Sequence, residues 1–478
     1  MTESYRELRR RLDAGETTCA QIVADSFDTI QRGSTLNAFL ATLPAEAAQR
    51  AAEVDARIQA GTAGPLAGMT VALKDNIALK DAQLTCGSKI LTGFTSLYSA
   101  TVVERLLAAD AIIVGKTNMD EFAMGSSNET SFFGPAYHPL DSTRVPGGSS
   151  GGSGIAVATG MACGSLGSET GGSVRQPAAF LGVVGVKPTY GRVSRYGLVA
   201  FASSLDQISP FARTVYDAAL MTEIIAGHDP NDTTSSSEPV PSYTNGLDEA
   251  DVRGMKIGLP REYFIDGMDE AVVARMQELQ RRLEDAGAEI VEISLPHTKH
   301  TIPCYYVIAT AEASSNLARF DGARYGYRSP NAETLEEMYE LSRTEGFGAE
   351  VKRRIMLGTF VLSSGFYDAY YRKAQQVRRL LHRDMVEAFQ QVDLILAPTT
   401  PTPAFRLGEK TSNPISMYLS DIFTAAANLT GVPAISFPIG NDSNGLPIGA
   451  QFMAPHFQEG RMFAGAAWAE RALGGGVA

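Results

Sequence analysis

Two clusters of small residues and one lysine are the residues of this chain best suited to chemistry. The clusters are GGSSGGS at 147–153 and TGGS at 170–173, and both follow an apolar stretch, VALKDN at 71–76, that contains Lys74. Glycines let backbone N–H groups approach a ligand closely, because no Cβ stands in the way. A serine among them can act as a nucleophile when a base removes its proton, and lysine is the candidate base. The pattern predicts an amide-cleaving enzyme.

Other interpretations of the glycine-serine clusters are weaker. A flexible linker is not expected so close to apolar sheet and helix patterns, and no Gly-Lys-Ser/Thr follows to make a P-loop. Residues 147–151 formally match the G-x-S-x-G nucleophile elbow of α/β-hydrolases. That elbow must leave a buried strand, yet 139–146 contains two prolines and two charged residues, and the six histidines show no distinguishing pattern. A histidine-dependent hydrolase is therefore the last alternative.

Composition and charge restrict the class of protein. Hydrophobic residues make up 44% and charged residues 20% of the 478, which is ordinary for a globular protein. The net charge of −12 argues against broad nucleic-acid binding by this chain itself. The first residues lack the layout of a signal peptide and no apolar run is long enough to cross a membrane, so we expect a cytoplasmic protein. Four scattered cysteines do not predict a disulfide framework, and we expect no metal site.

Hydrophobic spacing predicts helices over 3–60, followed by alternating short strands and amphipathic helices. Strands are expected at 69–73, 111–114, 181–186, 255–259, 289–293, 394–397 and 434–438, and helices at 100–109, 154–161 and 268–286. This alternation predicts an α/β protein with a mixed, substantially parallel sheet. We expect one domain over 1–478, comprising an N-terminal helical portion (1–64), a catalytic core (65–210), a surface loop (228–250) and a helical region (305–392).

The run from 147 to 191, GGSSGGSGIAVATGMACGSLGSETGGSVRQPAAFLGVVGVKPTYG, resembles the signature of the amidase signature family. Residues 71–76 resemble the strand that carries the catalytic lysine of that family. The resemblance implies a large mixed sheet flanked by helices, and a catalytic triad of Lys74, Ser149 and Ser173. Ser173 would be the acyl-forming nucleophile, and Ser149 would relay the proton from a segment, 148–150, that holds a cis peptide bond. Lys74 would be the general base.

Lysine can act as a base only in its neutral form. Its ordinary pKa is about 10.4, and burial among apolar neighbours can lower that pKa by several units. The position of Lys74 on an apolar strand allows such burial, although a lysine there could instead pair with Asp75 or another acid. The resemblance also implies an oxyanion hole formed by backbone N–H groups around Thr170, Gly171, Gly172 and Ser173.

Two departures from the family pattern are visible. Glu169 stands where the family usually has Asp, which keeps the charge and lengthens the side chain by one methylene. The order of residues in 127–130, SNET, also differs from the usual pattern after Met124-Gly125-Ser126. The first departure leaves the mechanism intact, and the second concerns the substrate contacts near 125–130. Arg175 and Gln176 are expected to brace the nucleophile loop rather than to touch substrate.

Stretches outside the core signature, at 187–198, 204–207, 312–322, 353–359 and 367–371, resemble one branch of that family. This branch comprises the ammonia-producing A subunits of bacterial aspartyl/glutamyl-tRNA amidotransferases. The resemblance implies that the substrate is glutamine, with Arg354 facing its carboxylate and Asp421 its ammonium group. Tyr305, Gly125 and Ser126 would line the pocket. By residue type alone, Arg354 and Asp421 would be ordinary exposed helix residues.

The resemblance further implies partners rather than cofactors for this chain. Ammonia would pass to a B subunit, which uses ATP and Mg²⁺ and binds the mischarged tRNA, while a small C subunit stabilises the complex. The alternatives are a stand-alone amidase acting on aliphatic or aryl amides and a non-catalytic scaffold protein. A stand-alone amidase predicts an apolar pocket without the charge pair, and a scaffold does not require an intact triad.

Overall fold

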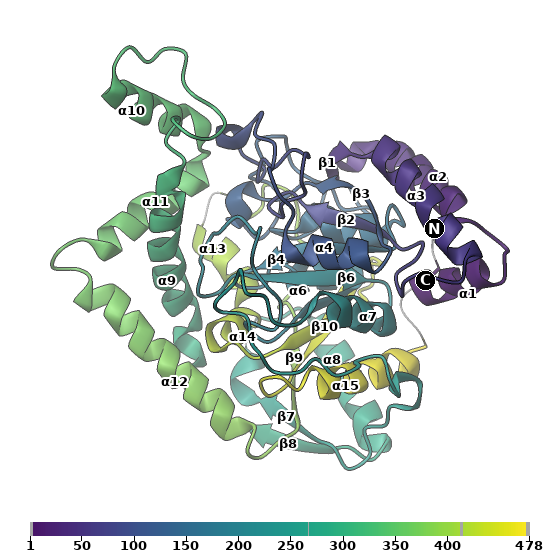
Figure 1. Ribbon diagram of the computed structural model, residues 1–478. Helices are drawn as coiled ribbons and strands as arrows, with labels where there is room; N and C mark the ends of the chain where they lie inside the picture. Colours follow the sequence, from purple (N-terminus) through teal and green to yellow (C-terminus); the bar gives the residue numbers. More distant parts are fainter. Residues whose placement is uncertain (1–2, 266, 412–413, 475–478) are drawn as a thin grey trace.

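The computed structural model describes residues 3–265, 267–411 and 414–474. Within these residues, eleven strands form one continuous sheet in the order β1-β3-β2-β4-β6-β5-β10-β11-β9-β7-β8 (Figure 1). The strands are β1 (Phe39–Thr42), β2 (Thr70–Lys74), β3 (Ile112–Thr117), β4 (Gly164–Glu169), β5 (Val184–Lys187), β6 (Gln207–Ala212), β7 (Lys256–Pro260), β8 (Glu289–Ile293), β9 (Leu394–Pro398), β10 (Ala434–Asn441) and β11 (Pro447–Met453). Most strands are buried along their whole length, so the sheet forms the centre of the main hydrophobic core.

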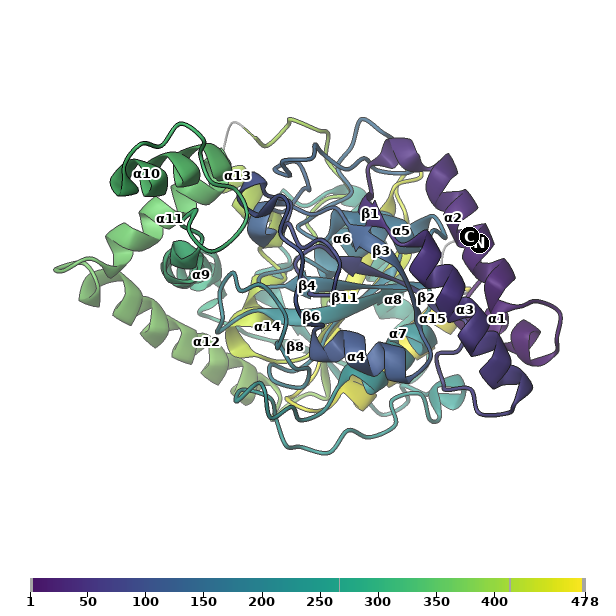
Figure 2. The same cartoon turned by 45° about the horizontal axis from the view of Figure 1, so that its top comes forward.

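Helices cover the sheet and extend beyond it. They are α1 (Tyr5–Asp13), α2 (Cys19–Arg32), α3 (Pro44–Gln59), α4 (Thr101–Ala108), α5 (Gly151–Ala158), α6 (Arg175–Leu181), α7 (Val215–Ile225), α8 (Glu270–Asp285), α9 (Thr301–Asn316), α10 (Leu335–Gly346), α11 (Ala349–Leu362), α12 (Lys373–Ala388), α13 (Pro414–Tyr418), α14 (Ala425–Thr430) and α15 (Glu459–Ala472). Helices α1 to α3 lie together at the β1 end of the sheet, in the direction opposite to α9 through α12 (Figures 1 and 2). None of the helices in the described part of the chain is long and apolar enough to cross a membrane.

The predicted large mixed sheet with flanking helices is confirmed, but the expectation that it is substantially parallel is wrong. Among the strand pairings of the described residues, four are parallel, namely β2 with β3 and β4, and β7 with β8 and β9, whereas six are antiparallel. The cause is a set of strands not expected from the sequence, β1, β4, β6 and β11. Of these, β1, β6 and β11 pair only antiparallel with their neighbours. The strand expected at 181–186 begins only at Val184, because α6 runs to Leu181.

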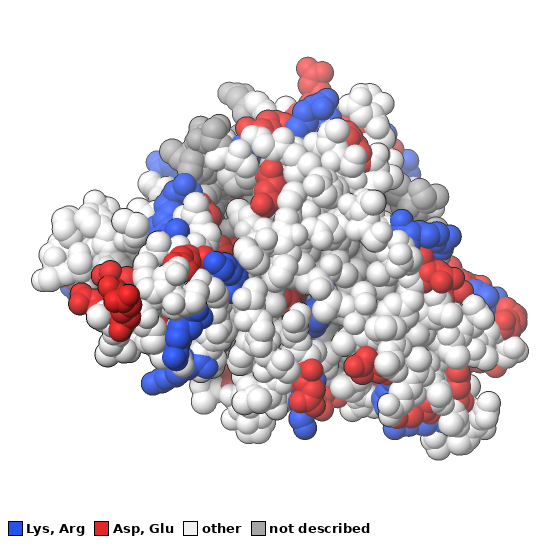
Figure 3. All heavy atoms as spheres, turned by 90° about the horizontal axis from the view of Figure 1, so that it is seen from above, with Lys and Arg blue, Asp and Glu red and all other residues white. Residues whose placement is uncertain are grey.

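The helical region forms a second layer beside the sheet. Helix α9 packs against α11 and α12, and the three lie apart from the sheet in both ribbon views (Figures 1 and 2). Their buried side chains join those of the segments 86–91, 119–124 and 201–205 in a hydrophobic core separate from that of the sheet. Seen from above in Figure 3, positive and negative side chains are interspersed, and the connection between α11 and α12 forms a mostly uncharged projection at the far left.

Candidate active site

Parallel pairing of β2 with β4 places the ends of the two strands together. Lys74 is the last residue of β2, and register pairs Leu73 with Leu166 on β4. The Lys74 ammonium nitrogen therefore reaches the end of β4, where it lies 3.1 Å from the carbonyl oxygen of Ser168. It lies 2.7 Å from the Ser149 hydroxyl oxygen. The lysine and the first serine predicted from the sequence are in direct contact.

The neighbouring Asp75 does not pair with Lys74. Successive side chains of a strand point to opposite faces, and the Asp75 carboxylate lies 3.5 Å from the ammonium nitrogen of Lys116 on β3. Thr85 also donates its backbone N–H to the Asp75 carboxylate, at 2.9 Å. The alternative that Lys74 is a structural ion-pair partner of Asp75 is therefore wrong.

The surroundings of Lys74 favour its neutral form. The side chain is fully buried, and burial lowers the pKa of Lys74 from 10.5 to about 7. The carboxylates of Asp120 and Asp206 act in the opposite direction, but burial has the larger effect on this pKa. At neutral pH a substantial fraction of Lys74 can therefore accept a proton.

The turn that carries Ser149 is held from two sides. The Gly148–Ser149 peptide bond is cis, as the resemblance implied, and α5 begins two residues after Ser149. The Asp120 N–H donates to the Ser149 carbonyl oxygen at 3.2 Å, and the Gly148 N–H donates to the Gln176 side-chain oxygen at 3.0 Å. The Ser150 N–H donates to the Ser173 carbonyl oxygen at 3.2 Å, so the two serine turns lie side by side. The proton relay from Ser149 to Ser173 itself stays a prediction.

The turn that carries Ser173 needs its glycines for space. Gly172 has a φ of +152°, and a Cβ there would lie 2.2 Å from the Thr424 hydroxyl oxygen. A Cβ on Gly171 would lie 2.7 Å from the ring of Tyr305. Within the described residues, the N–H groups of Gly171, Gly172 and Ser173 donate to no protein acceptor. These three donors are therefore free to stabilise an anionic oxygen, which is the chemistry expected of an oxyanion hole.

Glu169 and Arg175 form the buried brace of this turn. The Glu169 carboxylate accepts hydrogen bonds from the N–H groups of Val174 and Arg175, at 3.1 and 3.0 Å, where α6 begins. It also accepts from the Arg175 guanidinium, at 2.8 Å from Nε. Thr424 ties the turn from another side, donating its hydroxyl to the Gly171 carbonyl oxygen at 2.7 Å. The longer side chain of Glu169 thus makes the bracing contacts expected of an acid at this position.

Three of the predicted substrate-binding residues, Gly125, Ser126 and Arg354, line a cavity of about 300 Å³, whereas the two serine turns do not contribute to its lining. Arg354 is 3% exposed and is not a solvated helix arginine. Its Nε donates to the Glu350 carboxylate at 2.8 Å, and the rings of Tyr306 and Tyr418 lie 5.2 and 5.5 Å from its guanidinium carbon. The cavity wall therefore contains a buried guanidinium that is paired with Glu350 at Nε and is of the type that binds a carboxylate.

Asp421 connects this cavity to the Ser173 turn. Its carboxylate accepts the Ser126 hydroxyl at 2.6 Å, while its other oxygen is buried without a hydrogen-bond partner and lies 3.0 Å from where a Gly172 Cβ would be. Burial raises the pKa of Asp421 from 3.8 to about 7. Asp421 is thus not an exposed helix acid. Tyr305 is buried with its ring against Gly171, and neither Tyr305 nor Asp421 is among the residues that line this cavity.

Sequence reasoning missed Asp120 as a residue that organises the site. The Asp120 carboxylate accepts hydrogen bonds from the N–H groups of Ser127, Asn128 and Thr130, at 3.2, 2.8 and 3.1 Å. It therefore shapes the segment after Gly125-Ser126, whose residue order departs from the family pattern. The available signal was an acidic pair, Asp120-Glu121, between apolar residues and close to a cluster of small ones. Gln176, expected to brace, does so by also donating to the Ser126 carbonyl oxygen at 2.8 Å.

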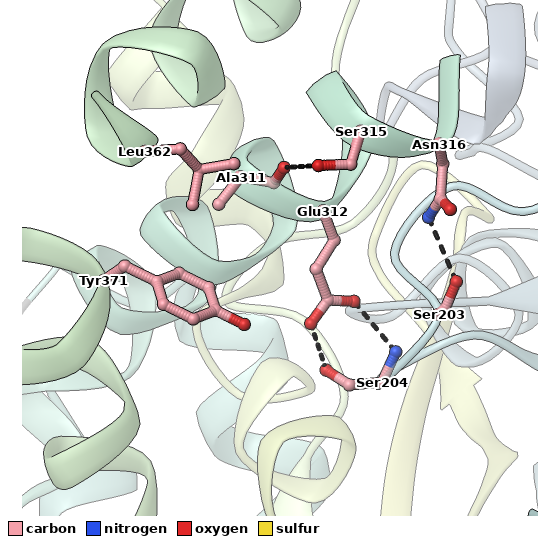
Figure 4. A pocket seen from close by; sticks show the side chains of 8 residues that line it. All are labelled: Ser203, Ser204, Ala311, Glu312, Ser315, Asn316, Leu362 and Tyr371. Carbon is pink, nitrogen blue, oxygen red and sulfur yellow. Dashed lines mark hydrogen bonds between the residues drawn. The ribbon is translucent and has the colours of Figure 1, made fainter. Parts of the chain in front are cut away.

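A second cavity, of about 320 Å³, lies between α9, the end of α11 and the loop at 203–204 (Figure 4). None of the predicted site residues lines it. Its Glu312 carboxylate accepts the backbone N–H and the hydroxyl of Ser204, at 2.8 and 2.6 Å, and Asn316 donates to the Ser203 hydroxyl at 3.0 Å (Figure 4). These polar groups form hydrogen bonds with one another, and the hydrogen bonds connect α9 of the helical region to the loop before β6.

The histidines do not join the serine turns. His138 is buried with Nε2 at the Phe180 carbonyl oxygen, and His297 pairs with Asp384, at 2.9 Å in both cases. Within the described residues, no group of three or more His, Cys, Asp or Glu side chains is placed to hold a metal ion. The described cysteines are buried free thiols.

Comparison with known proteins gives concordant matches. A family model described as Amidase matches residues 21–463. A Chlorobaculum tepidum protein, named as the A subunit of glutamyl-tRNA(Gln) amidotransferase, is 56% identical over 459 residues, covering 96% of this chain and 95% of that protein. The crystal structure of a Thermotoga maritima protein of the same name matches with a TM-score of 0.79 and 43% identity, covering 95% of this chain and 91% of that one. The native peptide amidase of Stenotrophomonas maltophilia matches with a TM-score of 0.82 and 30% identity, covering 98% and 96%.

Proposed function

Because the chain belongs to the amidase family, we propose that it is the glutamine-hydrolysing subunit of a tRNA-dependent amidotransferase. The names of its relatives in C. tepidum and T. maritima support this assignment. The observation that carries it is the contact between the buried Lys74 nitrogen and the Ser149 hydroxyl, 2.7 Å long, beside the Ser173 turn. A lysine with a lowered pKa next to paired serine turns is suited to cleaving an amide at neutral pH.

In the proposed reaction, neutral Lys74 takes the proton of Ser149, which takes the proton of Ser173. The Ser173 oxygen then attacks the side-chain amide carbon of glutamine. Negative charge develops on the amide oxygen, and the free N–H groups of Gly171, Gly172 and Ser173 stabilise it. The proton returns through Ser149 to the amide nitrogen, ammonia leaves, and a γ-glutamyl ester remains on Ser173. Water hydrolyses that ester to glutamate.

Recognition of glutamine rests on the two buried charges. Free glutamine carries a carboxylate and an ammonium group at its α-carbon, so its pocket should offer one cation and one anion. Arg354 supplies the cation in the cavity wall, and Asp421 supplies a carboxylate with one oxygen free of protein donors. Ser126 lines the same cavity as Arg354 and donates its hydroxyl to Asp421.

The ammonia has a consumer outside this chain. We propose that it passes to a B subunit that binds the mischarged tRNA and activates its glutamyl or aspartyl group with ATP and Mg²⁺, and that a C subunit completes the complex. The net charge of −12 fits a chain that leaves tRNA binding to a partner. In this proposal the chain uses no cofactor of its own and works in the cytoplasm, where aminoacyl-tRNAs are made.

A stand-alone amidase is the alternative, and the fold alone does not decide between the two. The peptide amidase of S. maltophilia has the same fold, as its TM-score of 0.82 indicates. The buried charges of Arg354 and Asp421 favour a zwitterionic substrate over an aliphatic or aryl amide. A non-catalytic scaffold is disfavoured by the intact contact of Lys74 with Ser149.

The test is ammonia release from glutamine by the purified chain, alone and with the B and C subunits, beside a simple aliphatic amide. We expect weak glutaminase activity that rises with partners and is abolished by Ser173→Ala. Brisk hydrolysis of the simple amide, unaffected by partners, would instead assign the chain to the stand-alone amidases. Ammonia release that persists in Ser173→Ala would refute the assignment of the nucleophile.

A further inference from the structure

Glu121 lines the same cavity, and the proposed reaction gives it no role. It lies in a short 3₁₀ turn, Glu121–Ala123, directly after Asp120. The side chain is only 2% exposed, and each of its carboxylate oxygens accepts the N–H of Gly348, at 2.9 and 3.1 Å. The Ser88 hydroxyl donates to the same carboxylate at 2.5 Å. Glu121 is therefore a buried acid with several protein donors and one face on the cavity.

The residue that Glu121 holds is the start of a helix. Gly348 is the N-cap of α11, and α11 carries Arg354 less than two turns further on. A carboxylate at this position also suits the partial positive charge of a helix N-terminus. Gly348 has no room for a side chain, since a Cβ there would lie 2.3 Å from the Glu121 oxygen. The helix start and the acid thus fit against each other directly.

Ser88 contacts the same junction as Glu121. The Ser88 hydroxyl also lies 3.3 Å from the carbonyl oxygen of Gly346, the last residue of α10. Ser88 and Glu121 therefore both form hydrogen bonds with the α10–α11 junction. On the other side of Glu121, Asp120 orders the segment after Gly125-Ser126 and donates its N–H to Ser149. The acidic pair therefore connects the helix of the arginine to the turn of the serine.

We propose that Glu121 is a positioning residue that fixes the N-terminus of α11 and thereby aims the Arg354 guanidinium at the substrate carboxylate. This inference rests on the proposed function, because it assigns a carboxylate-bearing substrate to the cavity. Glu121 acts through Arg354 and takes no part in bond making or breaking. Its loss should weaken recognition of the carboxylate and leave the chemical step intact.

The experiment measures kcat and KM for glutamine and for a simple aliphatic amide that lacks the α-carboxylate, using the assembled complex. We expect Glu121→Ala to raise KM for glutamine about tenfold or more, with kcat and the kinetics of the simple amide nearly unchanged. Glu121→Gln keeps one oxygen to accept from Gly348 and should recover part of the loss. In an Arg354→Ala background, Glu121→Ala should add nothing further to KM.

Glu262 provides a matched control. It likewise accepts one serine hydroxyl and one backbone N–H, from Ser294 and Leu295 at 2.6 and 2.9 Å, but it lies in the turn after β7. Glu262→Ala should lower the melting temperature without separating the two substrates. If Glu121→Ala does not fold, the Glu121→Gln variant decides by the same measurement.

The proposal is overturned if Glu121→Ala or Glu121→Gln impairs both substrates equally, or if its effect adds in full to that of Arg354→Ala. Failure of the proposed function has a different signature. In that case the wild-type complex does not hydrolyse glutamine, and Arg354→Ala fails to discriminate between the substrates.

Discussion

The reacting groups and the binding groups of the candidate site come from two differently built regions. Lys74, Ser149 and Ser173 lie at one edge of the sheet, on a strand end and two adjacent turns that backbone hydrogen bonds hold together. Arg354 and Asp421 come from segments far along the chain, which contacts of side chains at 121 and 126 hold in place. The reacting groups are thus fixed by the backbone of the central sheet, whereas Arg354 depends on the packing of the helical layer and Asp421 on the short turn Leu419–Asp421.

This difference indicates how substrate choice can change without loss of the chemistry. A substitution on α11 can alter the charge in the cavity without moving any strand. A substitution at 170–173 acts on the space between Gly171, Gly172 and their neighbours, where a Cβ would clash at 2.7 Å or less. The fold then hosts several amide substrates around one reacting centre, as is usual for a widely used scaffold.

Removal of the nucleophile is the strongest test of the sheet edge. Ser173→Ala should reduce kcat by about 10⁴-fold or more with both glutamine and a simple amide, because no oxygen remains to form the ester. Glutamine should still bind, since the cavity does not depend on that hydroxyl. Steady-state ammonia release together with isothermal titration checks both parts. Loss of binding along with activity would show that the two regions are not separable in this way.

Lys74 and Lys116 are both buried lysines on neighbouring strands, and replacing each in turn separates a role in catalysis from a role in stability. Lys74→Met should lower kcat by about 10²–10⁴-fold with little loss of stability, because Lys74 has no ion-pair partner among the described residues. Lys116→Met should do the opposite, since it leaves the buried Asp75 carboxylate without its cation, at a cost of about 3 kcal/mol. Thermal unfolding and ammonia release are measured on both variants. If both variants lost activity to the same extent, the contact with Ser149 would not be what gives Lys74 its role in catalysis.

The reacting residues of the site could be predicted from the sequence because each lies in a short segment with a recognisable pattern. Ser149 and Ser173 lie in one short run of small residues, and Lys74 stands on a strand whose apolar neighbours are all buried. The strand between the serines was missed, because β4 has the sequence GSLGSE and glycine and serine have low strand propensity. β6 was missed for a related reason, since it contains Pro210 in the interior of the sheet.

The binding half was accessible only through the family resemblance. Arg354 ends a run of three basic residues, and nothing in that run distinguishes the buried arginine from its exposed neighbour Arg353. The environment of Asp421 depends on Ser126, which lies far away in the sequence. Contacts between distant segments leave no periodic signal, so the hydrophobic pattern predicts the helices here but not the cavity between them.

Removing the charge complementarity tests the helical layer alone. Arg354→Ala should reduce kcat/KM for glutamine by about 10–100-fold, mainly through KM, because a charged hydrogen bond to the carboxylate is lost. The simple amide should lose little. Lys352→Ala is the matched control, since it lies in the same basic run and donates to the Thr344 carbonyl oxygen outside the cavity. A uniform loss with both substrates would place Arg354 in the support of the fold rather than in recognition.

The smallest expected effect is a difference in pH dependence between the two substrates. Burial lowers the pKa of Lys74 to about 7, so the fraction of neutral base falls about tenfold per pH unit below that value and saturates above about pH 8. Burial raises the pKa of Asp421 to about 7, so its anionic form, which glutamine needs, is also lost as the pH falls. The kcat/KM profile for glutamine should therefore fall more steeply on the acid side than that for the simple amide, which needs only Lys74. Asp421→Asn should make the two slopes equal while lowering the plateau for glutamine, and equal slopes in the wild type would contradict the assignment of Asp421 to the ammonium group.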